Sequence, residues 1–345
     1  MRYLSVSLVR NNDRGECSIK LALAQTVTHP SSAAMLFFAS VGALALSTLA
    51  WAYPNPGAVS GDTNVADPTL CKDSAGTYFL FSTAPGIQIR TSTDRTNWKL
   101  VGTVWTVGKE PAGTVSFTGD ASANLWAPDC TYKDGEFYLY YAASTFGTQN
   151  SGIFFAKSKT GLPGSWTDMG LVTSTKSGDN FNAIDPNLLI DGSTWRMSLG
   201  SFFGGIKGVT LSSSTGKLAS SSVTSLAQRG GSDAIEGSVV FKSGSYYYLF
   251  ASWDKCCDGL SSTYSIHVGR SKSATGPFVD KAGVSLTNGG GTVVLETHGS
   301  IVGPGGQDLM TDNDGVVIVY HYYTSTASKL GINLVDFSSG WPVLK

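Results

Sequence analysis

The chain has 345 residues, of which 41% are hydrophobic and 14% charged, and its formal net charge is −1. This hydrophobic fraction can bury a large core, and 41 glycines suit an all-β chain rich in turns. The near-neutral charge and the lack of a basic run argue against nucleic acid as a partner.

An apolar leader precedes the regular part of the chain. Met35 opens an apolar stretch that runs through Leu49, and Ala50-Trp51-Ala52 has the small-x-small pattern of a signal-peptidase site. We therefore expect residues 1–52 to be a leader with a signal peptide, with cleavage after Ala52, so that no membrane segment remains. The alternative is a signal anchor, because residues 35–52 are borderline in length for a bilayer. A gene model that starts too early, with Met35 as the true initiator, is also open.

A short phrase recurs five times in residues 53–345. It consists of a small or apolar lead-in, an ionisable residue and then apolar residues, and an aromatic strand-like run and a third apolar segment follow each copy. The copies contain Ala66-Asp67-Pro68, Ala127-Pro128-Asp129, Ile184-Asp185-Pro186, Ile235-Glu236-Gly237 and Thr297-His298-Gly299. Self-similarity at roughly 50 to 60 residues, with several short strands per unit, is typical of propeller blades. The sequence therefore predicts an all-β, five-bladed β-propeller as a single domain over 53–345.

The first strand of each propeller blade lies nearest the central axis. Residues that open these strands therefore converge at one end of the channel, although they are far apart in sequence. We expect the ionisable side chains of the five phrases to meet in one pocket: Asp67, Asp129, Asp185, Glu236 and His298.

Hydrolysis of a glycosidic bond needs one protonated and one ionised carboxyl group on either side of that bond. Asp67 and Glu236 are the candidate base and acid, at a separation of roughly 6.5 to 9.5 Å if a water must fit between them. Asp185 can keep the acid protonated by like-charge repulsion. An Asp before Pro is also common in ordinary turns, and Asp129 can be a residue that only orients its neighbours.

The aromatic and cysteine residues indicate a sugar contact and disulfides less specifically than the carboxyl groups indicate the catalytic site. Most Tyr and Trp runs read as blade core, and Trp126 is the aromatic residue that we expect beneath a sugar ring. The predicted mature domain contains four cysteines, and an even number in a secreted chain invites disulfides. A bond between Cys256 and Cys257 would brace the loop after a blade-four strand, whereas Cys71 and Cys130 can be paired or remain buried thiols.

The sequence resembles glycoside hydrolase family 43, and within it the secreted fungal-type endo-1,5-α-L-arabinanases, over essentially all of residues 53–345. The motifs that carry the resemblance are Val65-Ala66-Asp67-Pro68, Leu125-Trp126-Ala127-Pro128-Asp129, Asn182-Ala183-Ile184-Asp185-Pro186, Gly200-Ser201-Phe202-Phe203-Gly204-Gly205-Ile206, Ala234-Ile235-Glu236-Gly237, Trp253-Asp254-Lys255-Cys256-Cys257, Thr297-His298-Gly299 and Gly303-Pro304-Gly305-Gly306-Gln307. Each motif is modest alone, but their order makes the combination specific.

The resemblance implies a five-bladed propeller enzyme that cleaves internal linkages of arabinan by single displacement with inversion. From this and the leader, we expect a monomeric, extracellular protein. The resemblance implies Asp67 as general base, Glu236 as general acid and Asp185 as the residue that tunes the acid. It also implies a calcium ion held at His298 largely through waters, although calcium prefers oxygen ligands. His298 can instead be a hydrogen-bonded channel residue, and His321 is a second metal candidate. The implied substrate contacts are Asn182, Ala183, Ile184, Asp185 and Ser201, and we also expect Asp67 and Trp126 to bind the substrate.

Two other functions remain open at this stage. An exo-acting arabinofuranosidase or β-xylosidase of the same fold would keep all three carboxyl groups. A non-catalytic sugar-binding propeller would keep the aromatic residues but could lose the acid and base. The presence of Asp67, Asp185 and Glu236 together speaks against a binding module.

Overall fold

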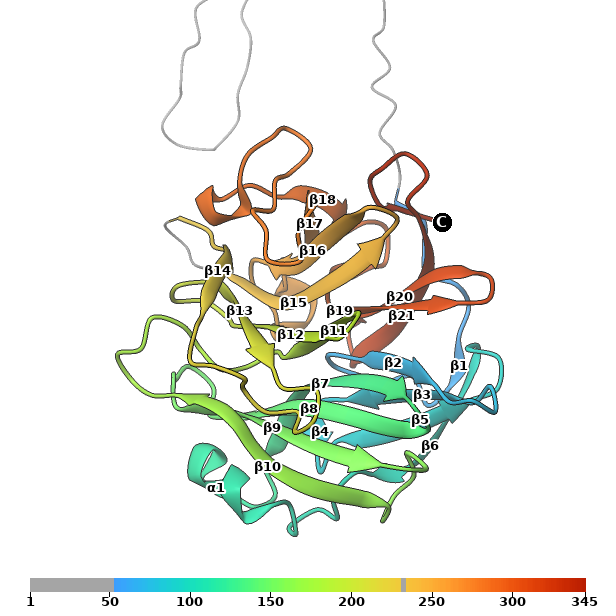
Figure 1. Ribbon diagram of the computed structural model, residues 1–345. Helices are drawn as coiled ribbons and strands as arrows, with labels where there is room; N and C mark the ends of the chain where they lie inside the picture. Colours follow the sequence, from blue (N-terminus) through green and yellow to red (C-terminus); the bar gives the residue numbers. More distant parts are fainter. Residues whose placement is uncertain (1–52, 231–233) are drawn as a thin grey trace, which may run out of the picture. The chain divides into compact units, whose positions relative to one another are not determined.

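The computed structural model describes residues 53–230 and 234–345 (Figure 1). The predicted leader and signal peptide, residues 1–52, lie outside the described residues. No helix in the described part of the chain is long and apolar enough to cross a membrane.

Five sheets form five blades, which confirms the predicted β-propeller. Blade I comprises β1 (Ser60–Gly61), β2 (Thr69–Lys72), β3 (Tyr78–Ser82), β5 (Gln88–Ser92) and β6 (Asn97–Thr103). Blade II comprises β4 (Ala84–Pro85), β7 (Asn124–Lys133), β8 (Glu136–Ser144), β9 (Ser151–Ser158) and β10 (Trp166–Thr175). Blade III comprises β11 (Asn187–Asp191), β12 (Thr194–Leu199), β13 (Ile206–Leu211) and β14 (Thr224–Ala227). Blade IV comprises β15 (Ile235–Ser243), β16 (Tyr246–Trp253), β17 (Ser265–Ser271) and β18 (Thr292–Leu295). Blade V comprises β19 (Val302–Asp312), β20 (Gly315–Tyr323), β21 (Ser328–Asp336) and β22 (Val343–Leu344). In the described residues, three short helices lie between strands: α1 (Ala112–Thr118), η1 (Gly259–Ser261) and η2 (Leu286–Asn288).

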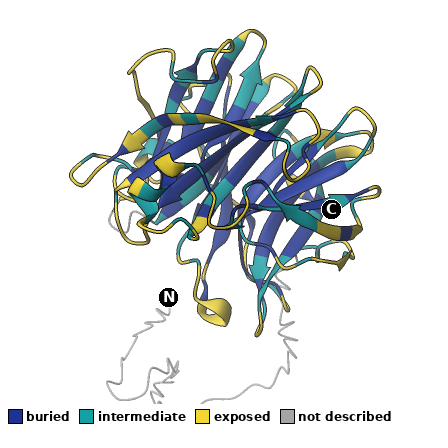
Figure 2. Cartoon of the chain, turned by 90° about the horizontal axis from the view of Figure 1, so that it is seen from below, coloured by how far each residue is buried: buried dark blue, intermediate teal, exposed yellow. Residues whose placement is uncertain are grey.

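The strands nearest the centre are β2, β7, β11, β15 and β19, and each contacts its neighbour around the ring (Figure 1). The aromatic runs form the second strand of each blade and are deeply buried, as Phe81, Tyr140 and Phe250 illustrate. Their side chains belong to hydrophobic clusters that each join two neighbouring blades. Figure 2 shows the resulting pattern, with buried strands inside and exposed loops outside. The core therefore lies between the blades and holds the inner strands in place.

The two ends of the domain close the ring together. Residues 57–65 run beside β21 of blade V, where the Gly57 N–H donates to the Ile332 carbonyl and the Leu330 N–H donates to the Thr63 carbonyl (2.8 and 2.9 Å). The same segment then supplies β1, which pairs in parallel with β6 of blade I. Blades I and V are thus joined by backbone hydrogen bonds as well as by apolar contacts.

A chain of polar side chains fastens the inner strands to one another. At equivalent positions in four inner strands, a side-chain oxygen accepts a backbone N–H from the next blade. The pairs are Thr69 with Cys130, Asp129 with Leu188, Asn187 with Val240 and Asp308 with Leu70, at 2.8 to 3.0 Å. The equivalent residue in blade IV is Val239, which has no polar side chain. These bonds satisfy buried donors and set the register of neighbouring blades.

The fastening positions also define the true repeat. Two residues before each of them, the backbone is left-handed in all five blades: Asp67 (φ 46°), Ala127 (40°), Asp185 (53°), Gly237 (56°) and Gly306 (58°). Asp67 and Asp185 are therefore equivalent, as the sequence phrases predict. The other three predicted equivalences are wrong: Asp129 comes two residues later than this position, Glu236 one residue earlier, and His298 lies before β19 begins.

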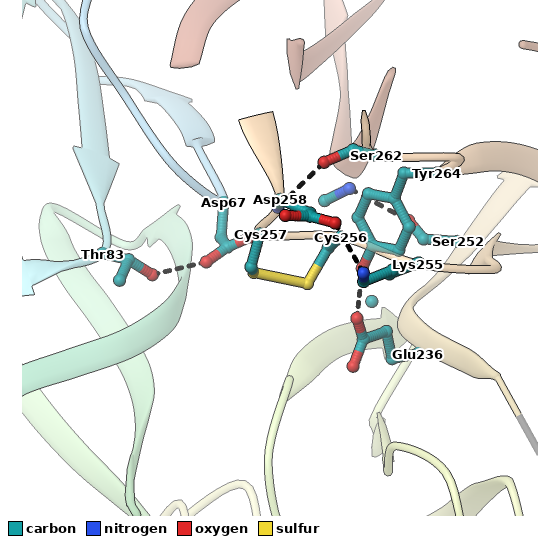
Figure 3. The surroundings of a disulfide bond; sticks show 12 residues. Asp67, Thr83, Glu236, Ser252, Lys255, Cys256, Cys257, Asp258, Ser262 and Tyr264 are labelled. Atoms are coloured by element: carbon teal, nitrogen blue, oxygen red, sulfur yellow. Dashed lines mark hydrogen bonds and ion pairs between the residues drawn. A yellow bond between two sulfur atoms is a disulfide. The ribbon is translucent and has the colours of Figure 1, made fainter. Parts of the chain in front are cut away.

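The four cysteines of the domain form two disulfides. Cys71 on β2 is bonded to Cys130 on β7, so this bond joins the inner strands of blades I and II. Cys256 is bonded to its neighbour Cys257 in the loop after β16 (Figure 3).

Candidate active site

A cavity of about 760 Å³ opens at the centre of the propeller, and all five blades contribute to its lining. Seven of the sequence-predicted site residues line it: Asp67, Trp126, Asn182, Ile184, Asp185, Ser201 and Glu236. Asp129 lies in the same lining. Ala183 and His298 do not contribute to it.

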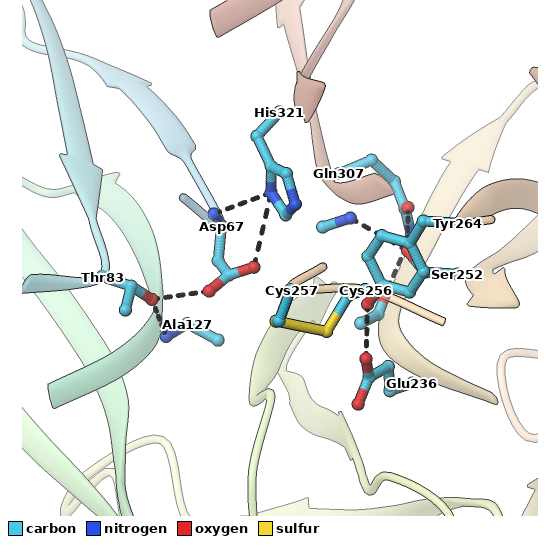
Figure 4. A network of polar contacts seen from close by, with 12 residues as sticks. Asp67, Thr83, Ala127, Glu236, Ser252, Cys256, Cys257, Tyr264, Gln307 and His321 are labelled. Carbon is cyan, nitrogen blue, oxygen red and sulfur yellow. Dashed lines mark hydrogen bonds and ion pairs between the residues drawn. A yellow bond between two sulfur atoms is a disulfide. The ribbon is translucent and has the colours of Figure 1, made fainter. Parts of the chain in front are cut away.

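Asp67 is fixed at the cavity wall by two hydrogen bonds (Figure 4). Its Oδ2 accepts a hydrogen bond from the Thr83 hydroxyl (2.7 Å), which in turn accepts the Ala127 N–H (2.8 Å). The backbone N–H of Asp67 donates to Nδ1 of His321 (3.1 Å). Its left-handed backbone, which Asp tolerates better than most residues, turns the chain sharply as it enters β2.

The partners of His321 determine its tautomer. Because Nδ1 accepts the Asp67 N–H, the proton must lie on Nε2, which donates to the Tyr323 hydroxyl (3.0 Å). Burial lowers the pKa of His321, and the nearby charge of Asp67 only partly opposes this effect. His321 is therefore a neutral support for Asp67.

Glu236 enters the cavity from blade IV. The pairing of β15 with β16 shifts register between Glu236 and Val239, and an irregularity of this kind can redirect a side chain out of the sheet. The Tyr264 hydroxyl donates to Oε1 (2.8 Å) and the Ser201 hydroxyl donates to Oε2 (2.6 Å). In Figure 4 the carboxyl groups of Asp67 and Glu236 extend into the central space from different sides.

Asp185 connects to the acid through the backbone. Its Oδ2 accepts the N–H of Gly237, the residue after Glu236, at 2.9 Å. Burial raises the pKa of Asp185 well above its ordinary value, and the negative charges of Glu236 and Asp67 raise it further. Burial also raises the pKa of Glu236; the Ser201 and Tyr264 hydroxyls oppose this rise, and Asp67 adds to it. The pair Asp185 and Glu236 is therefore built to retain a proton.

Asp129 lines the cavity, but its carboxyl group is used to hold the neighbouring blade. Both of its oxygens are occupied, because Oδ1 accepts the Asn187 side-chain amide (2.9 Å) and Oδ2 accepts the Leu188 N–H (2.8 Å). In Asp308 a single oxygen, Oδ2, accepts both the Thr69 hydroxyl (2.7 Å) and the Leu70 N–H (3.0 Å). Burial and the charge of Asp308 raise the pKa of Asp129 well above its ordinary value. These contacts match the expectation that Asp129 only orients its neighbours.

Ala183 points away from the cavity. Its side chain is fully buried in the hydrophobic cluster between blades II and III, and its N–H donates to the Thr175 hydroxyl (2.9 Å). Any contact between Ala183 and a substrate through its side chain is therefore excluded by this packing.

His298 lies outside the cavity because its phrase precedes β19 instead of opening it. The residue sits in a turn closed by hydrogen bonds with Ile301 (3.0 and 2.8 Å), and its Nδ1 faces the Glu296 carbonyl (2.8 Å). Within residues 53–230 and 234–345, no group of three or more His, Cys, Asp or Glu side chains is placed to hold a metal ion. The calcium ion expected at His298, held largely through waters, stays a prediction from the resemblance, and we assign no step of the chemistry to a metal.

Sequence reasoning missed Tyr264, Tyr323 and Gln307, and it ranked His321 second. Gln307 connects two blades, because its side-chain amide donates to the Gly237 carbonyl (2.6 Å) and its oxygen accepts the Ser252 hydroxyl (2.7 Å). Burial raises the pKa of Tyr264 well above its ordinary value, so its hydroxyl stays a donor to Glu236. Tyr264 and Tyr323 occur among many core aromatics, so the pattern gave no signal for them. His321 in an apolar aromatic strand was the one available signal.

Carboxyl groups on different walls of one cavity, one held by a hydroxyl and another belonging to a half-buried carboxyl pair, are typical of a glycosidase. The model of glycosyl hydrolases family 43 matches residues 58–342, and the chain belongs to this family. Arabinan endo-1,5-alpha-L-arabinosidase A of Aspergillus niger is 44% identical over 315 residues, which cover 87% of this chain and 96% of that protein.

Solved structures show the same relationship. The GH43 endo-arabinanase from Bacillus licheniformis has a TM-score of 0.77 and 38% identity, with 83% of this chain and 99% of that chain covered. The exo-1,5-alpha-L-arabinanase from a bovine ruminal metagenomic library has a TM-score of 0.76 and 34% identity, with 82% and 97% covered. Relatives of this chain thus include proteins named for endo and for exo action.

Proposed function

We propose that this protein is an endo-1,5-α-L-arabinanase, which hydrolyses internal α-1,5-L-arabinofuranosidic linkages of arabinan with inversion of the anomeric centre. The observation that carries the proposal is the placement of Asp67 and the Asp185–Glu236 pair in one cavity. The family membership and the endo-acting relative from Aspergillus niger support the choice of arabinan.

The reaction is a single displacement. Asp67 accepts a proton from a water molecule as the water oxygen bonds to the anomeric carbon, and Glu236 donates its proton to the departing oxygen as the glycosidic bond breaks. The Thr83 hydroxyl holds one oxygen of Asp67, so the other can face the water. Each turnover leaves Asp67 protonated and Glu236 ionised, and exchange with solvent restores both.

Asp185 is the positioning residue of the acid. Its carboxyl group lies near enough to Glu236 to influence proton affinity, and the interaction is mutual, because each negative charge disfavours the other. Its hydrogen bond from Gly237 holds the start of β15, so the backbone of Glu236 keeps its place during proton transfer.

The cavity lining suits a furanose chain. Trp126, Phe202 and Phe203 line it and offer apolar faces, and Phe202 and Phe203 remain 40% and 42% exposed. Asn182 and Ser201 supply polar groups in the same lining. Aromatic faces with a few polar groups are the usual means of orienting a ligand in a pocket.

The disulfides indicate the compartment in which the protein acts. Two disulfides among the described residues fit an oxidising compartment, and we propose that the protein is secreted and acts as a monomer outside the cell. Gel filtration coupled to light scattering tests the monomer, and N-terminal sequencing of the secreted protein tests cleavage after Ala52.

Product sizing after incubation with debranched arabinan tests the function. Endo action releases a mixture of oligomers from the start of the reaction, whereas exo action releases one short product. The exo alternative has specific support in the 34% identical exo-acting structure. A failure to cleave arabinan, with binding retained, would instead identify a binding module.

A further inference from the structure

The Cys256–Cys257 disulfide lies in the active-site cavity. Both cysteines line the cavity together with Asp67 and Glu236. Figures 3 and 4 show the bonded sulfurs between the side chain of Asp67 and the pair of Glu236 and Tyr264. Cys256 is half-buried and Cys257 is exposed, so the disulfide is accessible from the cavity.

The loop that carries the disulfide is anchored on both sides. Before it, Asp254 forms a salt bridge with Arg229 (2.6 Å). After it, the Thr263 N–H donates to the Lys255 carbonyl (2.9 Å), which closes the loop. Cys257 itself has a left-handed backbone (φ 65°) without being glycine, and the covalent ring formed by adjacent bonded cysteines restrains this conformation.

A chain of hydrogen bonds leads from the disulfide to Asp67. The Cys257 N–H donates to the Tyr323 hydroxyl (2.8 Å), which also accepts Nε2–H of His321 (3.0 Å). His321 in turn accepts the Asp67 N–H (3.1 Å). The backbone of the disulfide and the backbone of Asp67 are therefore held by a common pair of side chains.

We propose that the Cys256–Cys257 disulfide is a substrate-positioning element of this enzyme, an inference that rests on the proposed arabinanase function. The bonded sulfurs present a rigid, polarizable and apolar wall to the C–H face of the sugar bound between Asp67 and Glu236. The Tyr323 and His321 side chains keep that wall in register with Asp67. Two separate thiols would rotate independently and lose this surface.

Steady-state kinetics on debranched arabinan tests the proposal with the double variant Cys256→Ser/Cys257→Ser. Loss of a positioning contact should raise KM by about five- to tenfold, with a smaller change in kcat, because the acid and base remain in place. The matched control is Cys71→Ser/Cys130→Ser, which removes the other disulfide and should leave KM unchanged. Tyr323→Phe, which keeps the ring but removes the hydroxyl that accepts the Cys257 N–H, should raise KM in the same direction.

Mild reduction with a phosphine gives a second measurement that needs no variant. Alkylation and mass spectrometry should show reduction of the exposed Cys256–Cys257 bond before the buried Cys71–Cys130 bond. The wild type should then acquire the KM of the double-serine variant and recover on reoxidation, while that variant should not respond. If the folded double-serine variant or the reduced enzyme keeps the wild-type KM and only its melting temperature changes, the disulfide merely stabilises its loop. This result would overturn the proposal. A wild type inactive on arabinan would overturn the proposed function as well.

Discussion

The backbone N–H of Gly237 donates to Oδ2 of Asp185 across the boundary between blades III and IV. The residue next to Glu236, the proposed general acid, is thus tied to the carboxyl group with which Glu236 interacts electrostatically. Because the contact uses the backbone, it fixes the place of Glu236 independently of the Glu236 side chain. Charge and position of Asp185 can therefore be separated experimentally.

Asp185→Asn should shift the basic limb of the pH profile of kcat/KM to lower pH. The amide oxygen can still accept the Gly237 N–H, but an amide carries no negative charge, so the like-charge repulsion that keeps a proton on the Asp185–Glu236 pair is gone. The pKa of Glu236 then falls, and the acid loses its proton at a lower pH. Asp185→Ala, which also loses the hydrogen bond, should add a fall in kcat at every pH. An unmoved basic limb in Asp185→Asn would contradict the tuning role.

Tyr264→Phe should shift the same limb in the opposite direction. The Tyr264 hydroxyl donates to Oε1 of Glu236 and favours the ionised form, so its removal should raise the pKa of Glu236 further. Ser201→Ala should also raise the pKa of Glu236, because it removes the hydroxyl that donates to Oε2 of Glu236. Opposite shifts in Asp185→Asn and Tyr264→Phe, measured in the same buffers, would assign the basic limb to Glu236. Shifts of the same sign would assign it elsewhere.

Glu236→Gln and Asp67→Asn should each lower kcat by about 10²- to 10⁴-fold, the usual contribution of a general acid or base. Both amides keep the shape of the side chain, so circular dichroism and the affinity for arabino-oligosaccharides should stay close to wild type. Asp129→Asn is the comparison for a carboxyl group of the cavity that takes no part in proton transfer, and we expect it to affect stability more than kcat. Near-normal turnover in Glu236→Gln would refute the assigned acid.

The repeat in the sequence was sufficient to predict the propeller, because aromatic second strands and apolar third strands recur regardless of detail. It also placed Asp67 and Asp185 correctly, since both precede a proline at the left-handed opening of an inner strand. Asp67 and Glu236 come together only through fivefold closure of the backbone, which the repeat implies.

The register of blades II, IV and V could not be predicted in the same way. In these blades the left-handed position is Ala127, Gly237 or Gly306, so no ionisable residue marks it. The pairing is irregular at the start of β7, β15 and β19, and Asp129 and Glu236 lie two residues after and one residue before the left-handed position. His298 matched the phrase by chemistry but not by geometry, whereas His321 reached the cavity from a second strand that the phrase did not consider.

Removing the Cys71–Cys130 disulfide should lower the free energy of unfolding without changing catalysis. The bond closes a loop with a sequence separation of 59 and joins the inner strands of blades I and II. By restricting the unfolded chain, a disulfide that closes such a loop stabilises the folded state by up to about 4 kcal/mol. Urea denaturation of Cys71→Ser/Cys130→Ser should show the loss, while kcat and KM at 25 °C stay unchanged. A fall in kcat would mean that the bond also shapes the cavity.

Asp308 should make the folded protein less stable as pH rises. Burial raises its pKa from 3.8 to about 6, so the folded state keeps a proton that the unfolded state has already released. The free energy of unfolding should therefore fall between about pH 4 and about pH 6, by on the order of 3 kcal/mol for this group. Burial raises the pKa of Asp129 as well, which gives the same sign.

Asp308→Asn should remove much of that decrease. An amide oxygen can still accept the Thr69 hydroxyl and the Leu70 N–H, as Asn187 accepts the Val240 N–H at the equivalent position of blade III. Urea denaturation of both proteins at about pH 4.5 and about pH 7.5 measures the difference in slope. The variant should lose less stability than the wild type over this interval. Equal losses in the two proteins would show that Asp308 is already ionised in the folded state at low pH, and the inner strands would then owe their pH dependence to other groups.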